Sequence, residues 1–305
     1  MTVILNLGGT INTAYKDGKP VDKGIRGILG SSIDVINIMP VSSNNLEWEH
    51  LKILRDFILE KKKSKETRFL VATGTDTLEE VAYFLSLIIP ADVSLVVVGA
   101  LRLRSDPNSD GEQWLSLANN WLNEKTSHGI AICCGGPLIV GTEVEKVYQN
   151  GWTFRPLSDT GDGLLNWSLK EKYRLLPTPC VPILSVGIGV GSWLATILEM
   201  GNFDGVVIEA YAAGDVPSNL FEPIKRLLSA HVPVILASKS RPGLIEPLYP
   251  GTPGCSHDLL STGALGAGKL DSRKARIRLM VVLAARPRIP TKAAFRAQDE
   301  IEFNE

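Results

Sequence analysis

Two short loops carry threonine hydroxyls directly after apolar segments of strand length. The first loop, Gly8-Gly9-Thr10, follows the apolar run at residues 3–7, and the second, residues 73–77 with the sequence Thr-Gly-Thr-Asp-Thr, follows the run at 69–72. Glycine allows the backbone to turn sharply and to approach a ligand closely. A helix cap needs only one Ser, Thr or Asp, so four polar residues around a glycine exceed that requirement. These loops predict two hydroxyls, those of Thr10 and Thr75, in one crevice.

A threonine hydroxyl becomes an effective nucleophile only when a neighbouring group takes its proton. Asp76 is adjacent to Thr75, and Lys146 is expected to follow a short strand near residue 140. A carboxylate, a neutral lysine or a tyrosine would serve as that neighbour. As a helix cap, Thr75 or Asp76 would leave backbone N–H groups free to hold an anion. The simpler interpretation is structural: a helix cap and nothing more, with Lys146 as a solvated surface residue.

Both loops need a scaffold that brings them to one edge. Short, continuous apolar runs rich in β-branched residues alternate with segments of helical periodicity, which predicts a mostly parallel sheet covered on both faces. Ligands bind such sheets outside the carboxyl ends of the strands, where both threonine loops start. We expect strands at residues 3–7, 69–72, 94–98 and 130–134, and helices at 48–59, 78–89 and 116–122.

The alternating pattern breaks between residues 155 and 180, where Pro and Gly cluster with short polar stretches. A second αβ series follows, and a chain of 305 residues is long for a single core. We therefore expect two α/β domains, residues 1–160 and 182–305, joined by a connection at 161–181. In the second domain we expect strands at 183–186, 205–208 and 232–237, helices at 220–229 and 275–283, and an irregular tail after 285.

Charge and cysteine usage narrow the class of protein. The 32 basic and 33 acidic side chains give a formal net charge of −1, so we expect no nucleic-acid partner and no membrane partner. No apolar stretch reaches the about 18–20 residues needed to span a bilayer. The four cysteines lack a disulfide or C-x-x-C pattern, and the four histidines lack metal-ligand spacing. We therefore expect reduced thiols, no metal site and a cytoplasmic location.

Taken together in this order and spacing, the motifs resemble those of the bacterial-type L-asparaginase/glutaminase family over nearly the whole chain. The resemblance rests on the two threonine loops and on several further motifs. These are Glu79-Glu80, Val98-Gly99-Ala100, Asp110-Gly111, residues 205–217 and Lys274-Ala275-Arg276. We accordingly expect a two-domain α/β fold, with a flavodoxin-like N-terminal parallel sheet and a smaller C-terminal α/β domain.

The resemblance implies a role for each residue of the reactive centre. Thr10 would be the primary nucleophile and would form an acyl-enzyme. Thr75 would assist the water or the acyl transfer, with Lys146 as its proton partner. Asp76 would orient Lys146 and would bind the α-ammonium group of the substrate. The reaction that this set implies is the release of ammonia from L-asparagine.

The resemblance also implies substrate-binding residues around this centre. Ser42 matches the serine that holds the substrate α-carboxylate, and Ser43 is adjacent to it. Backbone N–H groups near Thr75 and Ala100 would stabilise the oxyanion, an effect of roughly 3–4 kcal/mol per donor in comparable sites. Gly74 and Ala100 are further expected substrate-binding residues. Tyr15 lies on the loop at residues 12–23, which we expect to act as a lid. The family implies a small-molecule amide substrate, no cofactor, and a homodimer or homotetramer.

Some positions depart from the family pattern. Thr73 stands where the family has a histidine, Gly135-Gly136 where it has an Asn-Asp pair, and Asp215 where an asparagine is usual. These changes surround the substrate more than the reacting groups, so L-glutamine or a modified amino-acid amide is the alternative to L-asparagine. They also allow a non-catalytic amino-acid-binding protein on this scaffold, although such a protein would not need a lysine placed to accept a proton.

Overall fold

The chain forms two compact units, each with its own sheet, in a computed structural model. The structure describes residues 2–16, 19–22, 25, 34–38, 41–124, 128–142, 144–156, 168–169, 173–176, 178–240 and 244–295. The first unit comprises Met1–Gly161 and Ser168–Lys172, and the second comprises Asp162–Trp167 and Tyr173–Glu305. Much of the expected connection at 161–181 lies outside the described residues.

The first unit is built on a six-stranded sheet of order β4-β1-β5-β6-β7-β8. Neighbouring strands are parallel, apart from β8, which pairs antiparallel with β7. The first five strands follow the flavodoxin-like order, in which the first strand lies between the second and the third. This arrangement confirms the expected fold class. The strands are β1 Val3–Asn6, β4 Asp34–Asn37, β5 Arg68–Ala72, β6 Ser94–Val98, β7 Gly129–Cys133 and β8 Ile139–Val140.

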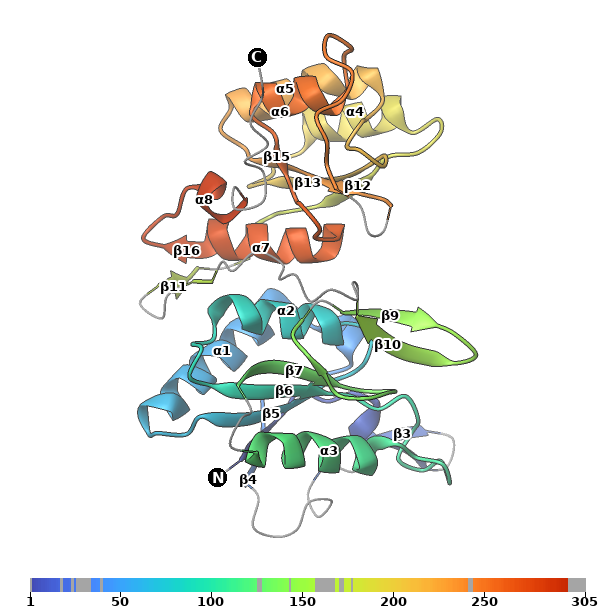
Figure 1. The fold of residues 1–305 in the computed structure, drawn as a ribbon, viewed down its shortest axis with the longest axis vertical. Helices are drawn as coiled ribbons and strands as arrows, with labels where there is room; N and C mark the ends of the chain where they lie inside the picture. Colours follow the sequence, from blue (N-terminus) through green and yellow to red (C-terminus); the bar gives the residue numbers. More distant parts are fainter. Residues whose placement is uncertain are drawn as a thin grey trace. The chain divides into compact units, whose positions relative to one another are not determined.

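Helices cover both faces of this sheet. Helices α1 (Trp48–Lys63) and α2 (Leu78–Ile88) lie on one face, and α3 (Gly111–Asn123) lies on the other (Figure 1). Because both faces are covered, β5 and β6 are almost entirely buried, and after their first residues, Arg68 and Ser94, they are continuously apolar. The adjacent Cys133 and Cys134 are buried, as expected for small apolar side chains, and burial raises the pKa of the Cys133 thiol to about 12.

Two antiparallel hairpins and two short 3-10 helices complete the first unit. Hairpin β9–β10 lies beside α2 (Figure 1). The remaining elements are the 3-10 helices η1 (Thr10–Asn12) and η2 (Ser43–Asn45), strands β2 (Thr13–Lys16) and β3 (Lys19–Asp22), and strands β9 (Val144–Tyr148) and β10 (Trp152–Pro156). Both 3-10 helices are part of connections that follow strands, so they influence the geometry at the carboxyl edge of the sheet.

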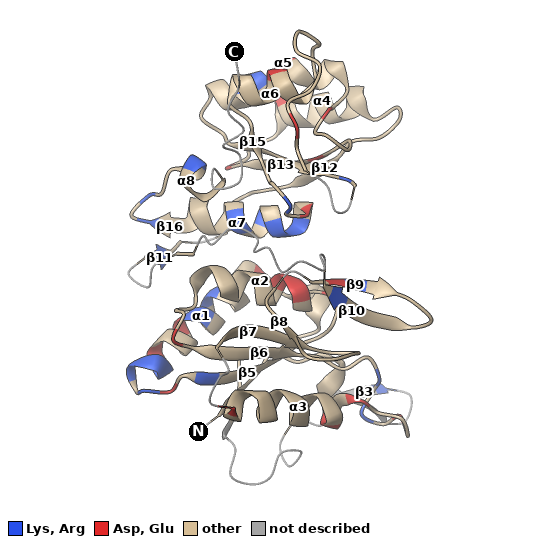
Figure 2. Ribbon diagram, viewed as in Figure 1, with Lys and Arg blue, Asp and Glu red and all other residues tan. Residues whose placement is uncertain are grey.

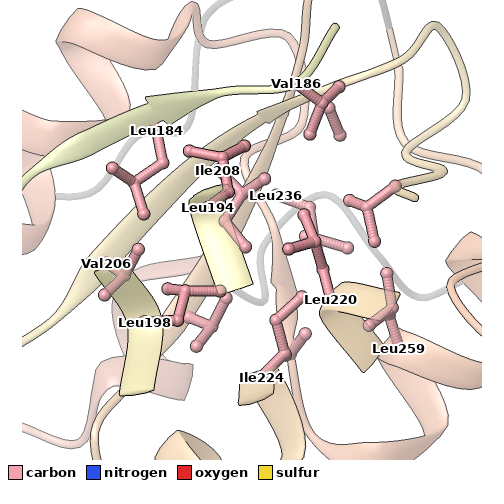
Figure 3. Close-up of a cluster of buried hydrophobic side chains, with 14 of the residues drawn as sticks. Leu184, Val186, Leu194, Leu198, Val206, Ile208, Leu220, Ile224, Leu236 and Leu259 are labelled. Atoms are coloured by element: carbon pink, nitrogen blue, oxygen red, sulfur yellow. The ribbon is translucent and has the colours of Figure 1, made fainter. Parts of the chain in front are cut away.

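The second unit is a smaller α/β layer structure with a parallel sheet of order β12-β13-β14-β15. Leucine, isoleucine and valine side chains from this sheet meet those of α4, α5 and α6 in one core (Figure 3). Helix α7 packs on β13 and β14. The elements are β11 Arg174–Leu175, β12 Ile183–Ser185, α4 Gly191–Met200, β13 Val206–Ala210, η3 Ser218–Leu220, α5 Phe221–Ser229, β14 Val234–Ser238, α6 Ser256–Thr262, β15 Leu265–Gly266, α7 Ser272–Ala284, β16 Ala285–Arg286 and α8 Thr291–Phe295.

Helix α7 carries several basic residues (Figure 2), and one of them is buried in an ion pair. Lys274 Nζ donates to Asp271 Oδ2 at 2.9 Å, and both side chains are almost fully buried. Burial by itself raises the pKa of the Asp271 carboxyl. The charge of Lys274 and the hydrogen bonds that it donates outweigh burial, so this pKa lies below its usual value. The pair fixes the start of α7, where Asp271 accepts the backbone N–H groups of Arg273 and Lys274.

Most expected elements are present with boundaries shifted by a few residues, and two of these expectations need correction. Helix α3 begins at Gly111, five positions before its expected start. The tail after residue 285 contains α8. Lys146 follows the short strand β8, as expected, and itself belongs to the next strand, β9. Among the described residues, no helix combines the length and apolar character needed to cross a membrane.

Candidate active site

The two threonine loops start at the switch point of the first sheet. Strands β1 and β5 are parallel neighbours, with Asn6 opposite Ala72 at their carboxyl ends. From β1 the chain builds the sheet outward in one direction through β4 and in the other through β5 and β6. The crevice outside the carboxyl ends at such a reversal is where open α/β sheets bind ligands. The loops that contain Thr10 and Thr75 both begin there.

The two loops are in backbone contact through glycines. Gly9, with a φ of 93°, lies so close to the backbone of Thr73 and Gly74 that any side chain at Gly9 would collide with it. Gly9 directly precedes Thr10, and Gly74 directly precedes Thr75. The contact therefore brings the segments that carry the two hydroxyls together. A glycine is required at Gly9 both for its positive φ and for this close approach.

A buried asparagine network holds the first loop. Asn6 Oδ1 accepts the backbone N–H of Gly8 at 2.9 Å and also a hydrogen bond from Asn12 Nδ2. Asn6 Nδ2 donates to Asn37 Oδ1 at 2.9 Å. Asn6 and Asn12 are both buried, so the bonds among Asn6, Gly8 and Asn12 form away from solvent. Sequence reasoning missed Asn6, although an amide at the end of a buried apolar strand signals a polar requirement there.

Lys146 joins the second loop to hairpin β9–β10. Its Nζ donates to Thr75 Oγ1 at 2.8 Å and to Asp76 Oδ1 at 2.9 Å. The Lys146 side chain is only 19% exposed, whereas Asp76 faces solvent. Because Thr75 Oγ1 accepts this bond, the hydroxyl hydrogen of Thr75 is left for another acceptor. Three of the four predicted catalytic residues are therefore in direct contact.

The loop after β5 does not cap helix α2 in the expected way. The N-cap residue of α2 is Thr77, and no side chain caps it. Thr77 Oγ1 instead donates to the carbonyl oxygen of Ser43 at 3.2 Å. The interpretation of Thr75 or Asp76 as the cap is wrong, because Lys146 takes up both side chains in a tertiary contact.

Glu79 anchors the strand that carries Lys146. This carboxylate lies in the first turn of α2 and is 2% exposed. Its Oε2 accepts the backbone N–H of Lys146 at 3.0 Å. The same helix that follows Thr75 therefore fixes the backbone position of Lys146. In the sequence, Glu79 belongs to a family-like motif at a helix start, and that position does not predict this long-range contact.

The predicted substrate-binding residues differ in their positions. Ser43 is buried, and its side chain lies against the Cα of Gly74. Ser42 is exposed as the N-cap residue of η2. Tyr15 belongs to β2, opposite Pro20 of β3, and its side chain is outside the described part. The expected lid at 12–23 is, in the residues described, largely this hairpin.

Ala100 lies directly after β6 in a loop that Asp110 holds. Asp110 Oδ2 accepts the backbone N–H of Leu101 at 3.1 Å and the indole N–H of Trp114 at 2.8 Å. Asp110 Oδ1 accepts the backbone N–H of Arg102 at 2.9 Å. Ala100 itself is 1% exposed. A carboxylate with three N–H donors thus determines the path of this third loop at the edge of the sheet.

We predict that Asp110→Ala lowers the free energy of unfolding by about 2–3 kcal/mol, because three N–H groups lose a charged acceptor. Urea denaturation followed by circular dichroism measures this change. Asp106→Ala is the matched control in the same loop, since Asp106 Oδ1 accepts one backbone N–H, from Asn108 at 2.8 Å, and should lose less than about 1 kcal/mol. Equal losses in the two variants would contradict the assigned role of Asp110.

Both halves of the chain match known domains. Residues 2–160 match the family model "Asparaginase, N-terminal", and residues 181–293 match "Glutaminase/Asparaginase C-terminal domain". The chain belongs to the asparaginase family. It is therefore an enzyme of the amidohydrolase class, and the non-catalytic alternative is set aside. Over the ranges that the structure describes, no group of three or more His, Cys, Asp or Glu side chains is arranged to hold a metal ion.

Individual asparaginases are similar over most of their length. A probable L-asparaginase of Deinococcus radiodurans is 28% identical over 305 residues, with 92% of each chain covered. An L-asparaginase of Bacillus licheniformis is 27% identical over 288 residues, with 83% of each chain covered. The fold also matches the crystal structure of a probable cytoplasmic L-asparaginase from Campylobacter jejuni, with a TM-score of 0.75 and 24% identity over 92% of this chain and 94% of that one.

Proposed function

We propose that this asparaginase-family enzyme hydrolyses L-asparagine to L-aspartate and ammonia through an acyl-enzyme on Thr10. The observation that carries the proposal is the contact of Lys146 Nζ with both Thr75 Oγ1 and Asp76 Oδ1. A threonine hydroxyl bonded to a lysine that also pairs with a carboxylate, beside a second threonine loop, has the form of an activated hydroxyl site. The names of the two similar L-asparaginases supply the substrate.

In the proposed acylation step, Thr10 Oγ1 attacks the side-chain amide carbonyl of the substrate. The new bond is an ester, the C–N bond breaks, and the nitrogen leaves as ammonia with the proton that Thr10 loses. Backbone N–H groups at Gly74–Thr75 and at Ala100 are the candidates for stabilising the oxyanion. In deacylation, water adds to the ester, its proton passes through Thr75 and Lys146, and Thr10 regains its hydrogen as aspartate leaves.

The polar groups around the crevice suit the two ends of an amino acid. Asp76 is largely exposed and offers a carboxylate for the α-ammonium group. For the α-carboxylate we favour Ser43 over Ser42, because the Ser43 side chain lies against Gly74 in the crevice and Ser42 is exposed. Tyr15 is retained as the proposed lid contact.

L-Glutamine is the second candidate substrate, because the C-terminal family model is described as glutaminase/asparaginase. A modified amino-acid amide is the third, since departures such as Gly135-Gly136 surround the substrate.

We further propose a homodimer or homotetramer that acts on small molecules in the cytoplasm. The four free thiols and the probable cytoplasmic structural relative support the location.

The first test is ammonia release from L-asparagine, L-glutamine and D-asparagine by the purified enzyme. We expect L-asparagine to give the highest kcat/KM, with one aspartate formed per ammonia, because Asp76 and Ser43 suit a short α-amino acid. A glutamate-forming reaction with higher kcat/KM would replace asparagine by glutamine as the substrate. Release of no ammonia from any of them would contradict the proposed function.

A further inference from the structure

Hairpin β9–β10 presents one face that runs from the core to solvent. In its antiparallel register, Lys146 is opposite Phe154, and Tyr148 is opposite Trp152. Residues opposite each other and two apart along a strand share a face of the ribbon. Phe154 is buried, Lys146 is nearly so, and Tyr148 and Trp152 are 68% and 56% exposed. Two large aromatic side chains therefore lie in solvent directly outward from Lys146.

Trp152 borders the reactive group itself. The centroid of its indole is 5.2 Å from Lys146 Nζ, a cation–π distance. The same Nζ is 2.8 Å from Thr75 Oγ1. Because both distances are measured from Lys146 Nζ, the centroid of the indole can be no farther from Thr75 Oγ1 than their sum. The indole therefore lies close to the Thr75 hydroxyl. Tyr148 contacts the indole edge to face, with ring centroids 5.3 Å apart.

The hairpin fixes this aromatic surface while leaving it open. On the opposite face of the ribbon, Thr153 Oγ1 donates to the carbonyl of Gly135 at 2.8 Å, and Arg155 pairs with Glu145. At the base, Glu79 holds the backbone of Lys146. The ribbon is therefore held by its back and base, and the indole is left exposed beside a reactive centre. An exposed aromatic surface in such a place is suited to an apolar part of a ligand.

We propose that Trp152 determines specificity by binding an apolar, preferably aromatic, substituent on the nitrogen of the hydrolysed amide. The inference rests on the proposed function, in which Asp76 and Ser43 bind the two α-groups of the substrate. The amide nitrogen is then the position at which a substituent is free to extend, and the indole borders the reacting groups. The enzyme accordingly accepts N-aryl amides of aspartate: the acyl group passes to Thr10, the C–N bond breaks, and the arylamine leaves with the proton of Thr10.

The test compares two substrates, L-asparagine and the β-anilide of L-aspartate, in wild type, Trp152→Ala and Trp152→Phe. Loss of a ring contact in a substrate pocket is worth about 10-fold or more in selectivity. The quantity compared is the ratio of kcat/KM for the anilide to kcat/KM for L-asparagine. We expect Trp152→Ala to lower this ratio at least about 10-fold and Trp152→Phe to restore most of it. Trp193→Ala, which removes another exposed tryptophan, should leave the ratio unchanged.

Three outcomes would overturn the inference. An equal loss on both substrates would mean that Trp152 acts only on Lys146 through the cation–π contact. Unchanged kcat/KM values for both substrates would place the indole outside the substrate site. A Trp152→Ala enzyme that dissociates into smaller species in analytical ultracentrifugation, with an unchanged ratio, would assign the aromatic pair to contact with a second copy.

A binding measurement separates this inference from the proposed function. Calorimetric titration of the anilide into Thr10→Ala, with and without Trp152→Ala, needs no turnover. Weaker binding of the anilide, but not of L-asparagine, in the double variant would support the role of Trp152 even if hydrolysis failed. If the anilide bound equally tightly to Thr10→Ala and to the double variant, the role of Trp152 would be refuted, even if L-asparagine were hydrolysed normally.

Discussion

Thr10→Ala is expected to lower kcat/KM for L-asparagine by about 10³-fold or more, equivalent to about 4 kcal/mol of transition-state stabilisation. The proposed ester cannot form without the Thr10 hydroxyl, and the other groups of the site cannot replace a covalent intermediate. The free energy of unfolding should change little, because the loop is held by the Asn6 network and by the contact of Gly9 with Gly74. Continuous ammonia assays and urea denaturation measure the two quantities.

Two neighbouring substitutions make this result specific. Thr10→Ser keeps a hydroxyl and should retain measurable turnover. Thr13→Val is the matched control three positions later, since Thr13 Oγ1 only donates to the carbonyl of Gly9 at 3.0 Å; its effect should be mainly on stability. Turnover close to wild type in Thr10→Ala would remove Thr10 from the mechanism and would make Thr75 the remaining candidate nucleophile.

The parts of the structure that were predictable depend on local sequence. Continuous apolar runs such as residues 94–98 become buried strands because both faces of a parallel sheet are covered. The glycines before Thr10 and Thr75 identify positions where two backbone segments can approach closely, as Gly9 and Gly74 do. From these features the sheet edge, and both threonine loops at it, follow without any knowledge of long-range contacts.

The parts that were missed depend on contacts between distant residues. Glu79 looks like an ordinary acidic helix start, and only the tertiary fold brings its carboxylate to the Lys146 backbone. Ser42 and Ser43 are both predicted to bind substrate, and the path of η2 places the Ser43 side chain against Gly74, which their adjacent positions in the sequence do not predict. The local sequence is consistent with Thr75 as a helix cap, whereas in the fold its hydroxyl accepts a hydrogen bond from Lys146. Local pattern identifies candidate side chains, whereas the fold decides their partners.

Lys146→Met is expected to lower kcat by about 10²–10³-fold while substrate binding persists. Methionine keeps most of the apolar length of the side chain but removes the donor that Thr75 Oγ1 and Asp76 Oδ1 share. Asp76 remains exposed and able to bind an α-ammonium group, so KM should change less than kcat. Lys52→Met is the matched control: Lys52 has a similar side-chain exposure of 18% and pairs with Glu49 at 2.9 Å, and its loss should leave kcat unchanged.

A double-mutant cycle with Thr75→Val decides whether Lys146 works through Thr75. If the two residues form one unit, the double variant should be about as slow as the slower single variant, because each substitution already disables the pair. Losses that multiply would instead mean that Lys146 and Thr75 act on separate steps, with the 2.8 Å contact serving structure alone. Thr75→Ser, which preserves the hydroxyl, should retain the sensitivity to Lys146→Met. The cycle therefore tests the contact on which the proposed mechanism depends, independently of which amide proves to be the best substrate.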